Sequence, residues 1–222
     1  MAVRQGRGRV APAQLSEMVV LMGRFPIEGK GKSRLAAELG VQRAHEIHQL
    51  LFRHALETFS RCAFGCVMAW AEPLPPDASF SSKVPTLLQR GATLGDRMVN
   101  AAQDVQTSTG AEIITLVGTD LPAIDCGDVA WAEGEVRQGF DAAILPAKDG
   151  GFGLISMRNW SHHIWAPDMP WGTSEVMELT RAGFRKAGLR WQEGAMTTDV
   201  DTASDWQEFC QKHPTFARNG SI

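Results

Sequence analysis

The order of apolar segments predicts an α/β protein with three layers, in which helices cover both faces of a mostly parallel sheet. Short apolar runs at residues 18–22, 65–71, 113–117 and 142–145 alternate with segments whose apolar residues recur at helical spacing. Such alternation is typical of strands joined by right-handed helical crossovers. In addition, the run at 113–117 stops abruptly before Asp120, and ligands of open α/β sheets bind at the carboxyl ends of strands.

Length and composition favour one folded domain. The chain has 222 residues, of which 44% are hydrophobic and 21% are charged, as in ordinary globular proteins. Residues 1–16 are rich in Gly, Arg and Ala without periodicity, and the residues after 212 show no pattern either. We therefore expect a single domain at residues 17–212, between a flexible N-terminal tail at 1–16 and a C-terminal tail at 213–222.

Charge and cysteine usage exclude several classes of function. The net charge is −3, and there is no long basic run or Arg–aromatic stripe for a nucleic-acid polymer. No apolar stretch approaches the roughly 20 residues that a membrane span needs. The four cysteines form no CxxC pair, which argues against zinc and favours reduced thiols. These features together predict a cytoplasmic protein.

The first half of the chain predicts these elements in order. A strand at 18–22 precedes a long glycine-containing loop, and apolar residues at helical spacing predict a helix at about 41–60. A strand at 65–71 leads into residues 72–85, whose prolines indicate a surface connection. A helix at 94–106 then leads into the strand at 113–117.

The second half begins with a helix near 125–137 and a strand at 142–145. A turn at 148–151 and an apolar run at 152–157 predict an antiparallel addition to the sheet. A helix at 173–186 is expected to open on Thr173 or Ser174, with Glu175 in its first turn as part of a cap. A short strand at 189–191 and a helix at about 203–212 complete the domain.

Asp120 is the most informative residue of the chain. Gly118 allows close approach to the backbone, and Pro122 prevents the strand from running on, so Asp120 is expected to project into a crevice. Asp199 and Asp201 alternate in an acidic segment farther along, and they point the same way if the backbone is extended. One of them could complete a metal site with Asp120.

A basic glycine loop follows the first strand. It carries Arg24, Lys30, Lys32 and Arg34 among glycines, and backbone amides with such cations make a cradle for phosphates. The spacing is neither that of a P-loop nor GxGxxG, so neither an ATPase nor a dinucleotide fold is supported.

Two further segments fall at expected strand ends. Asp149 begins a stretch with Gly150 and Gly151, whose paired glycines would let a ligand or the backbone come close. Trp171 precedes the expected helix start, which suits a sugar face or an anionic group. No nucleophile with an acid–base partner is visible. The constellation therefore points to chemistry on a phosphorylated donor, with Mg²⁺ or Mn²⁺ bridging carboxylates and a diphosphate.

Six motifs in this order resemble the small bacterial GT-A-like transferases of the arsenosugar-biosynthesis and radical-SAM/selenodomain-associated glycosyltransferase type. The chain is more distantly similar to molybdenum-cofactor and phospholactate guanylyltransferases. The resemblance spans about residues 17–206 and rests on GKSRL, QRGATLGDRM, GTDLP, PAKDGGFGL, PWGTSEV and DVDTASD. It implies the fold of nucleotide-diphospho-sugar transferases.

The resemblance also implies a role for individual residues. Lys32 and Arg34 would hold the phosphates of the nucleotide, and Asp120 and Asp201 would bind Mg²⁺ or Mn²⁺. The pocket for nucleotide and donor would be bordered by Gly91, Gly95, Thr119, Gly150 and Gly151, and the acceptor side by Trp171, Thr173 and Ser174. Asp120 is one candidate for a catalytic residue, and Asp149 and Glu175 are the other two.

Three functions remain open at this point. The favoured one is a metal-dependent glycosyltransferase that uses a nucleotide-sugar donor and a small-molecule acceptor. In the alternative, a nucleotidyltransferase of the guanylyl or cytidylyl type takes a nucleoside triphosphate and releases pyrophosphate. A catalytically inactive nucleotide-binding protein is a third reading, since no obvious base is present. Fold alone does not separate them.

Overall fold

The computed structural model describes residues 16–76, 78 and 83–214. Most of the predicted N-terminal tail and of the C-terminal tail therefore lies outside the described residues, as does part of the predicted surface connection at 72–85. Within the described residues, no helix combines the length and the apolar character that crossing a membrane requires.

The described residues form one sheet of seven strands in the order β3-β2-β1-β4-β6-β5-β7. The strands are β1 (Glu17–Gly23), β2 (Gly65–Trp70), β3 (Thr86–Leu88), β4 (Ile113–Gly118), β5 (Ala142–Pro146), β6 (Phe152–Met157) and β7 (Trp191–Glu193). Only β6 runs antiparallel to its neighbours, β4 and β5. The prediction of a mostly parallel sheet with an antiparallel addition is confirmed.

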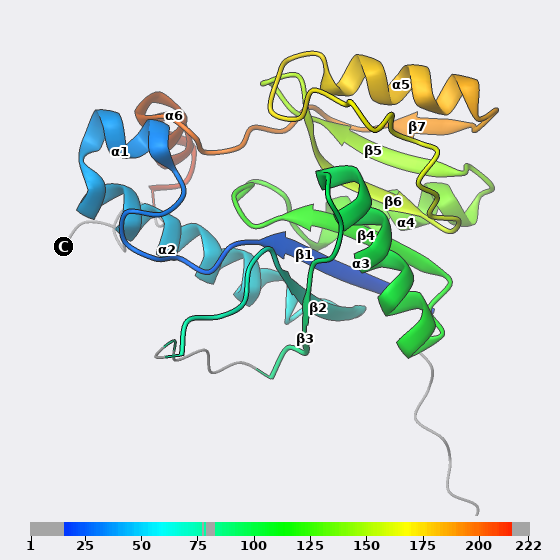
Figure 1. Cartoon of the computed structure of the whole chain (residues 1–222), viewed down its shortest axis with the longest axis horizontal. Helices are drawn as coiled ribbons and strands as arrows, with labels where there is room; N and C mark the ends of the chain where they lie inside the picture. The colour runs from blue at the N-terminus through cyan, green and yellow to red at the C-terminus, as the bar shows by residue number, and fades with distance from the viewer. Residues whose placement is uncertain (1–15, 77, 79–82, 215–222) are drawn as a thin grey trace, which may run out of the picture.

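Helices cover both faces of the sheet (Figure 1). The helices are α1 (Ser33–Leu39), α2 (Val41–Phe59), α3 (Leu94–Thr109), α4 (Cys126–Arg137), α5 (Val176–Lys186) and α6 (Ala203–Lys212). Buried side chains of α3 and α5 share one apolar core with the strands, and those of α2 and α4 share the other. The three-layer architecture follows, because each of these four helices buries an apolar stripe against one face of the sheet.

A third apolar cluster joins α1, α2 and α6 beyond the end of the sheet. Leu35 of α1 and Ile47 of α2 are fully buried there, together with Trp206 of α6. In Figure 1, α1 and α6 lie together on the side toward which the arrow of β1 points. This cluster holds two segments far apart in sequence next to the carboxyl ends of β1 and β4.

Several expected boundaries differ from the structure. Residues 33–39 were expected within a loop but form α1. Strand β3, which pairs with β2, lies just after the predicted connection at 72–85, where no element was expected. The strand expected at 189–191 is β7, two residues later. Short elements carry little periodicity, so their positions depend on the tertiary neighbours that bury them.

The start of α5 is also later than predicted. The helix begins at Val176, and its N-cap residue, Glu175, makes no side-chain cap hydrogen bond. Thr173 instead donates its hydroxyl to the carbonyl of Pro170 at 2.9 Å, and the Met177 amide donates to the carbonyl of Gly150 at 2.7 Å. The first contact is local and the second is tertiary, and together they hold residues 173–175 in a turn.

The expectation of reduced thiols is wrong for two of the cysteines. Cys62 and Cys126 form a disulfide, with their Cα atoms 5.8 Å apart, while Cys66 and Cys210 are free. The pair joins the turn after α2 to the first residue of α4. Their proximity arises from packing α2 and α4 on the same face, which the spacing of cysteines in the sequence does not reveal.

Candidate active site

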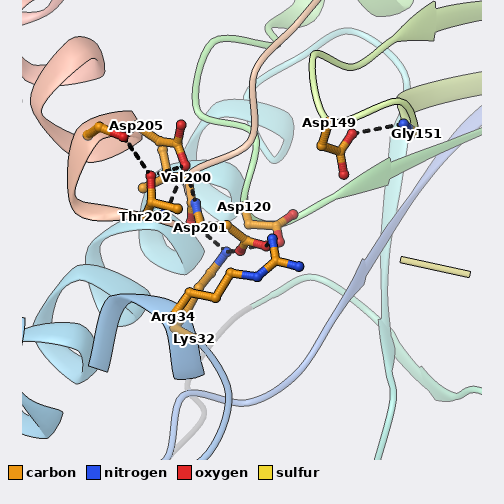
Figure 2. Close-up of polar contacts among 10 residues, drawn as sticks. Lys32, Arg34, Asp120, Asp149, Gly151, Val200, Asp201, Thr202 and Asp205 are labelled. Carbon is orange, nitrogen blue, oxygen red and sulfur yellow. Dashed lines mark hydrogen bonds and ion pairs between the residues drawn. The ribbon is translucent and has the colours of Figure 1, made fainter. Parts of the chain in front are cut away.

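Lys32, Asp120 and Asp201 meet at the carboxyl end of the sheet (Figure 2). The Lys32 Nζ atom lies 3.1 Å from Asp120 Oδ2 and 2.7 Å from Asp201 Oδ1. It also donates a hydrogen bond to the carbonyl of Val200 at 2.7 Å. Three segments separated by more than eighty residues from one another thus converge on a single ammonium group.

In this cluster, the ion pairs together affect the pKa values of Lys32 and Asp120 more than burial does. The side chain of Lys32 is only 7% exposed, and burial alone would lower its pKa. The nearby carboxylates of Asp120 and Asp201 raise the pKa above its ordinary value instead. Burial likewise opposes ionisation of Asp120, but Lys32 lowers its pKa below the usual range. Lys32 and Asp120 are therefore both charged at neutral pH.

Local structure positions each of these side chains. Lys32 has a left-handed backbone (φ 46°) and is the N-cap of α1, so its side chain leaves the loop just before the helix starts. Asp120 follows β4 in a turn, and its carbonyl accepts a hydrogen bond from the Val200 amide at 3.0 Å. Val200 is buried in the cluster formed by α1, α2 and α6. Asp199 and Asp201 flank it on the cavity side.

The helix α6 fixes Asp201 through a capping box. Thr202 accepts from the Asp205 amide, and Asp205 Oδ2 accepts from the amides of Thr202 and Asp201 at 2.8 and 3.2 Å. Arg34 is 63% exposed and lies 3.7 Å from Asp201. The segment that carries Asp201 is thus held both by its own helix and by the basic loop.

Two adjoining cavities open at this end of the sheet. The first, which we call the basic cavity, has a volume of about 320 Å³. Its lining residues include Arg24, Lys32, His48, Gln89, Arg97, Thr119, Asp120 and Asp201. Burial, and then Lys32, lower the pKa of His48 to about 4, so this imidazole is neutral.

The second cavity, which we call the acidic cavity, has a volume of about 290 Å³. Its lining residues include Asp120, Asp149, Asp199, Phe152, Trp171 and Thr173. It shares Met22, Leu94 and Asp120 with the basic cavity. Asp120 therefore stands at the junction of the two.

Two of the glycines expected at the nucleotide pocket have a packing role. A Cβ atom on Gly95 would lie 3.1 Å from the Trp171 ring, and one on Gly91 would lie 2.5 Å from the Cβ of Asp96. Neither glycine is among the described residues that line the basic cavity or the acidic cavity. Gln89, Leu94 and Arg97 of the same stretch do so instead.

The glycine pair after Asp149 serves two purposes. Asp149 Oδ1 accepts a hydrogen bond from the Gly151 amide at 2.8 Å, which shapes the turn, and both residues line the acidic cavity. Gly150 has φ 89°, and a Cβ there would lie 2.2 Å from the carbonyl oxygen of Ser174. It thus lets the segment before α5 pack directly on the turn.

The structure does not bring every predicted residue to the site. Thr173 lines the acidic cavity with Trp171, whereas Ser174 and Glu175 are exposed and line neither cavity. Glu175 is therefore outside the group formed by Lys32, Asp120 and Asp201.

Asp199, which the sequence offered with Asp201 as a possible partner of Asp120 but which was not assigned to the site, lines the acidic cavity. Burial, and then the charges of Asp149, Asp201 and Asp120, raise its pKa to about 6. The alternation of Asp199 and Asp201 around a valine was the available signal, because an extended segment with a buried middle residue turns both neighbours the same way.

Several solved structures similar to the chain are described as transferases or synthetases. A crystal structure described as a "putative nucleotide-diphospho-sugar transferase" from Desulfovibrio desulfuricans G20 is 27% identical, has a TM-score of 0.76, and aligns over 89% of this chain and 87% of its own. CMP:2-keto-3-deoxy-manno-octonic acid synthetase complexed with CTP is 17% identical, with a TM-score of 0.56 and coverages of 90% and 99%. A nucleotidyl transferase from Methanothermobacter thermautotroptrophicus is 13% identical, with a TM-score of 0.57 and coverages of 92% and 99%.

At their level of identity, the last two structures establish the fold alone. No curated protein matches the chain. One family model, described as uncharacterized protein conserved in bacteria (DUF2064), matches residues 58–173, which include β4, Asp120 and Trp171. The chain therefore belongs to this bacterial family and has the fold of nucleotide-diphospho-sugar transferases.

Proposed function

We propose that the protein is a metal-dependent glycosyltransferase that uses a nucleotide-sugar donor and a small-molecule acceptor. The observation that carries this proposal is the pair of adjoining cavities that share Asp120. One is rich in cations and the other in carboxylates and aromatic rings. A donor with an anionic diphosphate between a nucleoside and a sugar matches this division.

The basic cavity would hold the nucleoside diphosphate. Arg24, Lys32 and Arg97 line it, and such cations bind phosphates by charge-assisted hydrogen bonds. Lys32 Nζ lies between Asp120 and Asp201, so a metal ion bound by these carboxylates would release the charge of Lys32 for the diphosphate. A cation beside a departing diphosphate stabilises the charge that develops on it.

Asp120 and Asp201 have the chemistry that Mg²⁺ or Mn²⁺ requires. Both carboxylates converge on one point, now taken by the Lys32 ammonium, so both can reach a single cation. Within the described residues, no group of three or more His, Cys, Asp or Glu side chains is arranged to hold a metal. A bound diphosphate and water would supply the remaining oxygen ligands. Such an ion would offset negative charge on the leaving diphosphate.

The nucleotidyltransferase alternative stays open because the chain shares its fold with a synthetase complexed with CTP. Glycosyl transfer is favoured by the higher identity to the structure described as a nucleotide-diphospho-sugar transferase. The two reactions differ in the leaving group. Glycosyl transfer releases a nucleoside diphosphate, whereas nucleotidyl transfer releases pyrophosphate.

Thermal unfolding with a panel of ligands tests the proposal. The panel contains nucleoside diphosphates, sugar nucleotides and nucleoside triphosphates, each with and without Mg²⁺ or Mn²⁺. A ligand at 100 times its dissociation constant stabilises the fold by about 2.7 kcal/mol, which is visible as a higher melting temperature. We expect a metal-dependent shift with one sugar nucleotide in the wild type.

Two variants make the test specific. Asp120→Asn should lose the metal-dependent shift while retaining its fold, and Asp168→Asn, an exposed aspartate that lines neither cavity, should keep it. A preference for triphosphates with release of pyrophosphate would establish the alternative. If no nucleotide of the panel raises the melting temperature, nucleotide-dependent transfer is refuted altogether.

A further inference from the structure

Two carboxylates of the acidic cavity, those of Asp149 and Asp199, have no cationic partner among the described residues, whereas Asp120 is paired with Lys32. Asp120, Asp149 and Asp199 line the cavity, and the described residues that line it include no Lys, Arg or His. Figure 2 shows Asp149 on a separate segment from Asp120 and Asp201, so these carboxylates come from different parts of the chain. The basic cavity, by contrast, carries three cations.

Two lysines close to this cavity already have carboxylate partners other than Asp149 and Asp199. Lys148 precedes Asp149 in the chain, but its Nζ lies 3.0 Å from Glu208. Lys32 is held by Asp120 and Asp201. Among the described residues, neither Asp149 nor Asp199 forms a salt bridge. Binding of Mg²⁺ at Asp120 and Asp201 would leave both of these carboxylates facing the cavity.

Aromatic rings form another wall of the same cavity. Phe152 and Trp171 both line it, with ring centroids 6.5 Å apart, and Trp165 packs against both. The electron-rich face of an aromatic ring attracts cations, most strongly when the site excludes water. The carboxylates and the aromatic rings of this cavity therefore both favour a cationic ligand.

The charge of the acceptor determines whether the charges of Asp149 and Asp199 are compensated when the acceptor displaces water from the cavity. An anionic acceptor would be repelled by them. A neutral acceptor would displace water from Asp149 and Asp199 without replacing the charge compensation, which is costly. A cation would compensate both carboxylates and also contact the rings.

We propose that the acceptor bound in the acidic cavity is a small molecule that carries a positive charge, such as an ammonium group. This inference rests on the proposed function, because it names the acceptor class for the same site. It predicts that molecules with a phosphate or a carboxylate next to the accepting hydroxyl are rejected.

Three hydroxyl compounds of similar shape and different charge test the inference. Choline is cationic, 3,3-dimethylbutan-1-ol is its neutral counterpart, and 3-hydroxy-2,2-dimethylpropanoate is anionic. Their binding to the full chain is measured by calorimetry in the presence of Mg²⁺. Choline should bind about tenfold more tightly than the neutral alcohol, and the anion should bind weakest.

Matched variants assign the preference to the cavity. The double variant Asp149→Asn, Asp199→Asn should lose most of the preference for choline, and each single variant should lose part of it. Asp168→Asn should retain it, because this exposed aspartate lies outside the cavity lining. The melting temperature of every variant is measured to confirm that it is folded.

Equal affinity for choline and the neutral alcohol, tighter binding of the anion, or no binding of any probe would each overturn the inference. Retention of the preference in the folded double variant would overturn it as well. The donor panel reports separately on the proposed function. Donor binding without a choline preference would refute only the acceptor class, whereas a choline preference without donor binding would refute glycosyl transfer.

Discussion

Gly150 and Gly172 offer a matched comparison at the scale of single residues. Both have a positive φ, of 89° and 82°, and both belong to the segments that meet beside the acidic cavity. A Cβ on Gly150 would lie 2.2 Å from the carbonyl oxygen of Ser174, whereas one on Gly172 would meet nothing within 4 Å. The two positions therefore separate backbone strain from steric overlap.

Gly150→Ala should be the more damaging of the two substitutions. Both variants put alanine in the left-handed region, at about 1–2 kcal/mol, but only Gly150→Ala also drives two backbone segments apart. We expect the free energy of unfolding from urea titrations to fall by at least about 2 kcal/mol more for Gly150→Ala. Equal losses in the two variants would mean that the contact with Ser174 relaxes at little cost.

Lys32 illustrates how one residue acquires its role from distant partners. In the sequence it belongs to a basic loop, and an interaction with phosphate was the expected role. In the structure its ammonium group already neutralises Asp120 and Asp201. It holds together the two carboxylates that are the candidates for binding metal.

At the scale of elements, the N-terminus of α6 positions Asp201. Thr202→Ala removes the hydroxyl that accepts from the Asp205 amide, and loss of an N-cap costs about 1 kcal/mol. Because Asp205 also accepts from the amide of Asp201, fraying of this turn should loosen Asp201. We expect weaker metal-dependent donor binding in the ligand panel.

Asp125→Ala is the control for this prediction. Asp125 caps α4 in the same kind of capping box and lines neither cavity. It should lower the melting temperature by a similar amount while leaving donor binding unchanged. If both variants bind the donor like the wild type, the cap of α6 stabilises the helix without positioning Asp201.

The disulfide acts at the scale of the whole molecule, since it joins residues 64 positions apart. A cross-link of this length restricts the unfolded chain and stabilises a fold by about 2–4 kcal/mol. The double variant Cys62→Ser, Cys126→Ser should lose this amount in urea unfolding. A reductant should destabilise the wild type similarly and have no effect on the variant; a wild type insensitive to reductant would contradict the prediction.

A buried glutamate should make global stability dependent on pH. Glu133 of α4 is 2% exposed, and burial, together with the charge of Glu17, raises its pKa from 4.5 to about 7. Between these values the folded state keeps a proton that the unfolded state has released. Stability should therefore fall as the pH rises from about 4.5 to 7, and stay low above it.

Glu133→Gln isolates this effect, because the amide does not ionise. Relative to this variant, the wild type should lose about 3 kcal/mol of unfolding free energy between pH 4.5 and pH 8. Urea unfolding across this range measures the difference. Parallel profiles for the two proteins would show that Glu133 is ionised in the fold at low cost.

The long elements were predictable because their residues carry enough periodicity. The predicted strand at 113–117, the helix at about 41–60 and the helix at about 203–212 lie within a residue or two of β4, α2 and α6. The start of α5 was predicted wrongly, since contacts of Thr173 and Met177 with remote or neighbouring backbone decide it. Local pattern cannot report a hydrogen bond to Gly150.

The sequence by itself determined the alternation of strands and helices, and it placed Asp120 at a strand end, because both depend on local spacing of apolar and polar residues. Only the tertiary structure decided that Lys32 pairs with Asp120 and Asp201, that Asp199 faces the acidic cavity, and that Glu175 lies outside it. Cys62 and Cys126 were likewise joined only by folding. Such contacts arise from the packing of segments far apart in the chain, which no local spacing encodes.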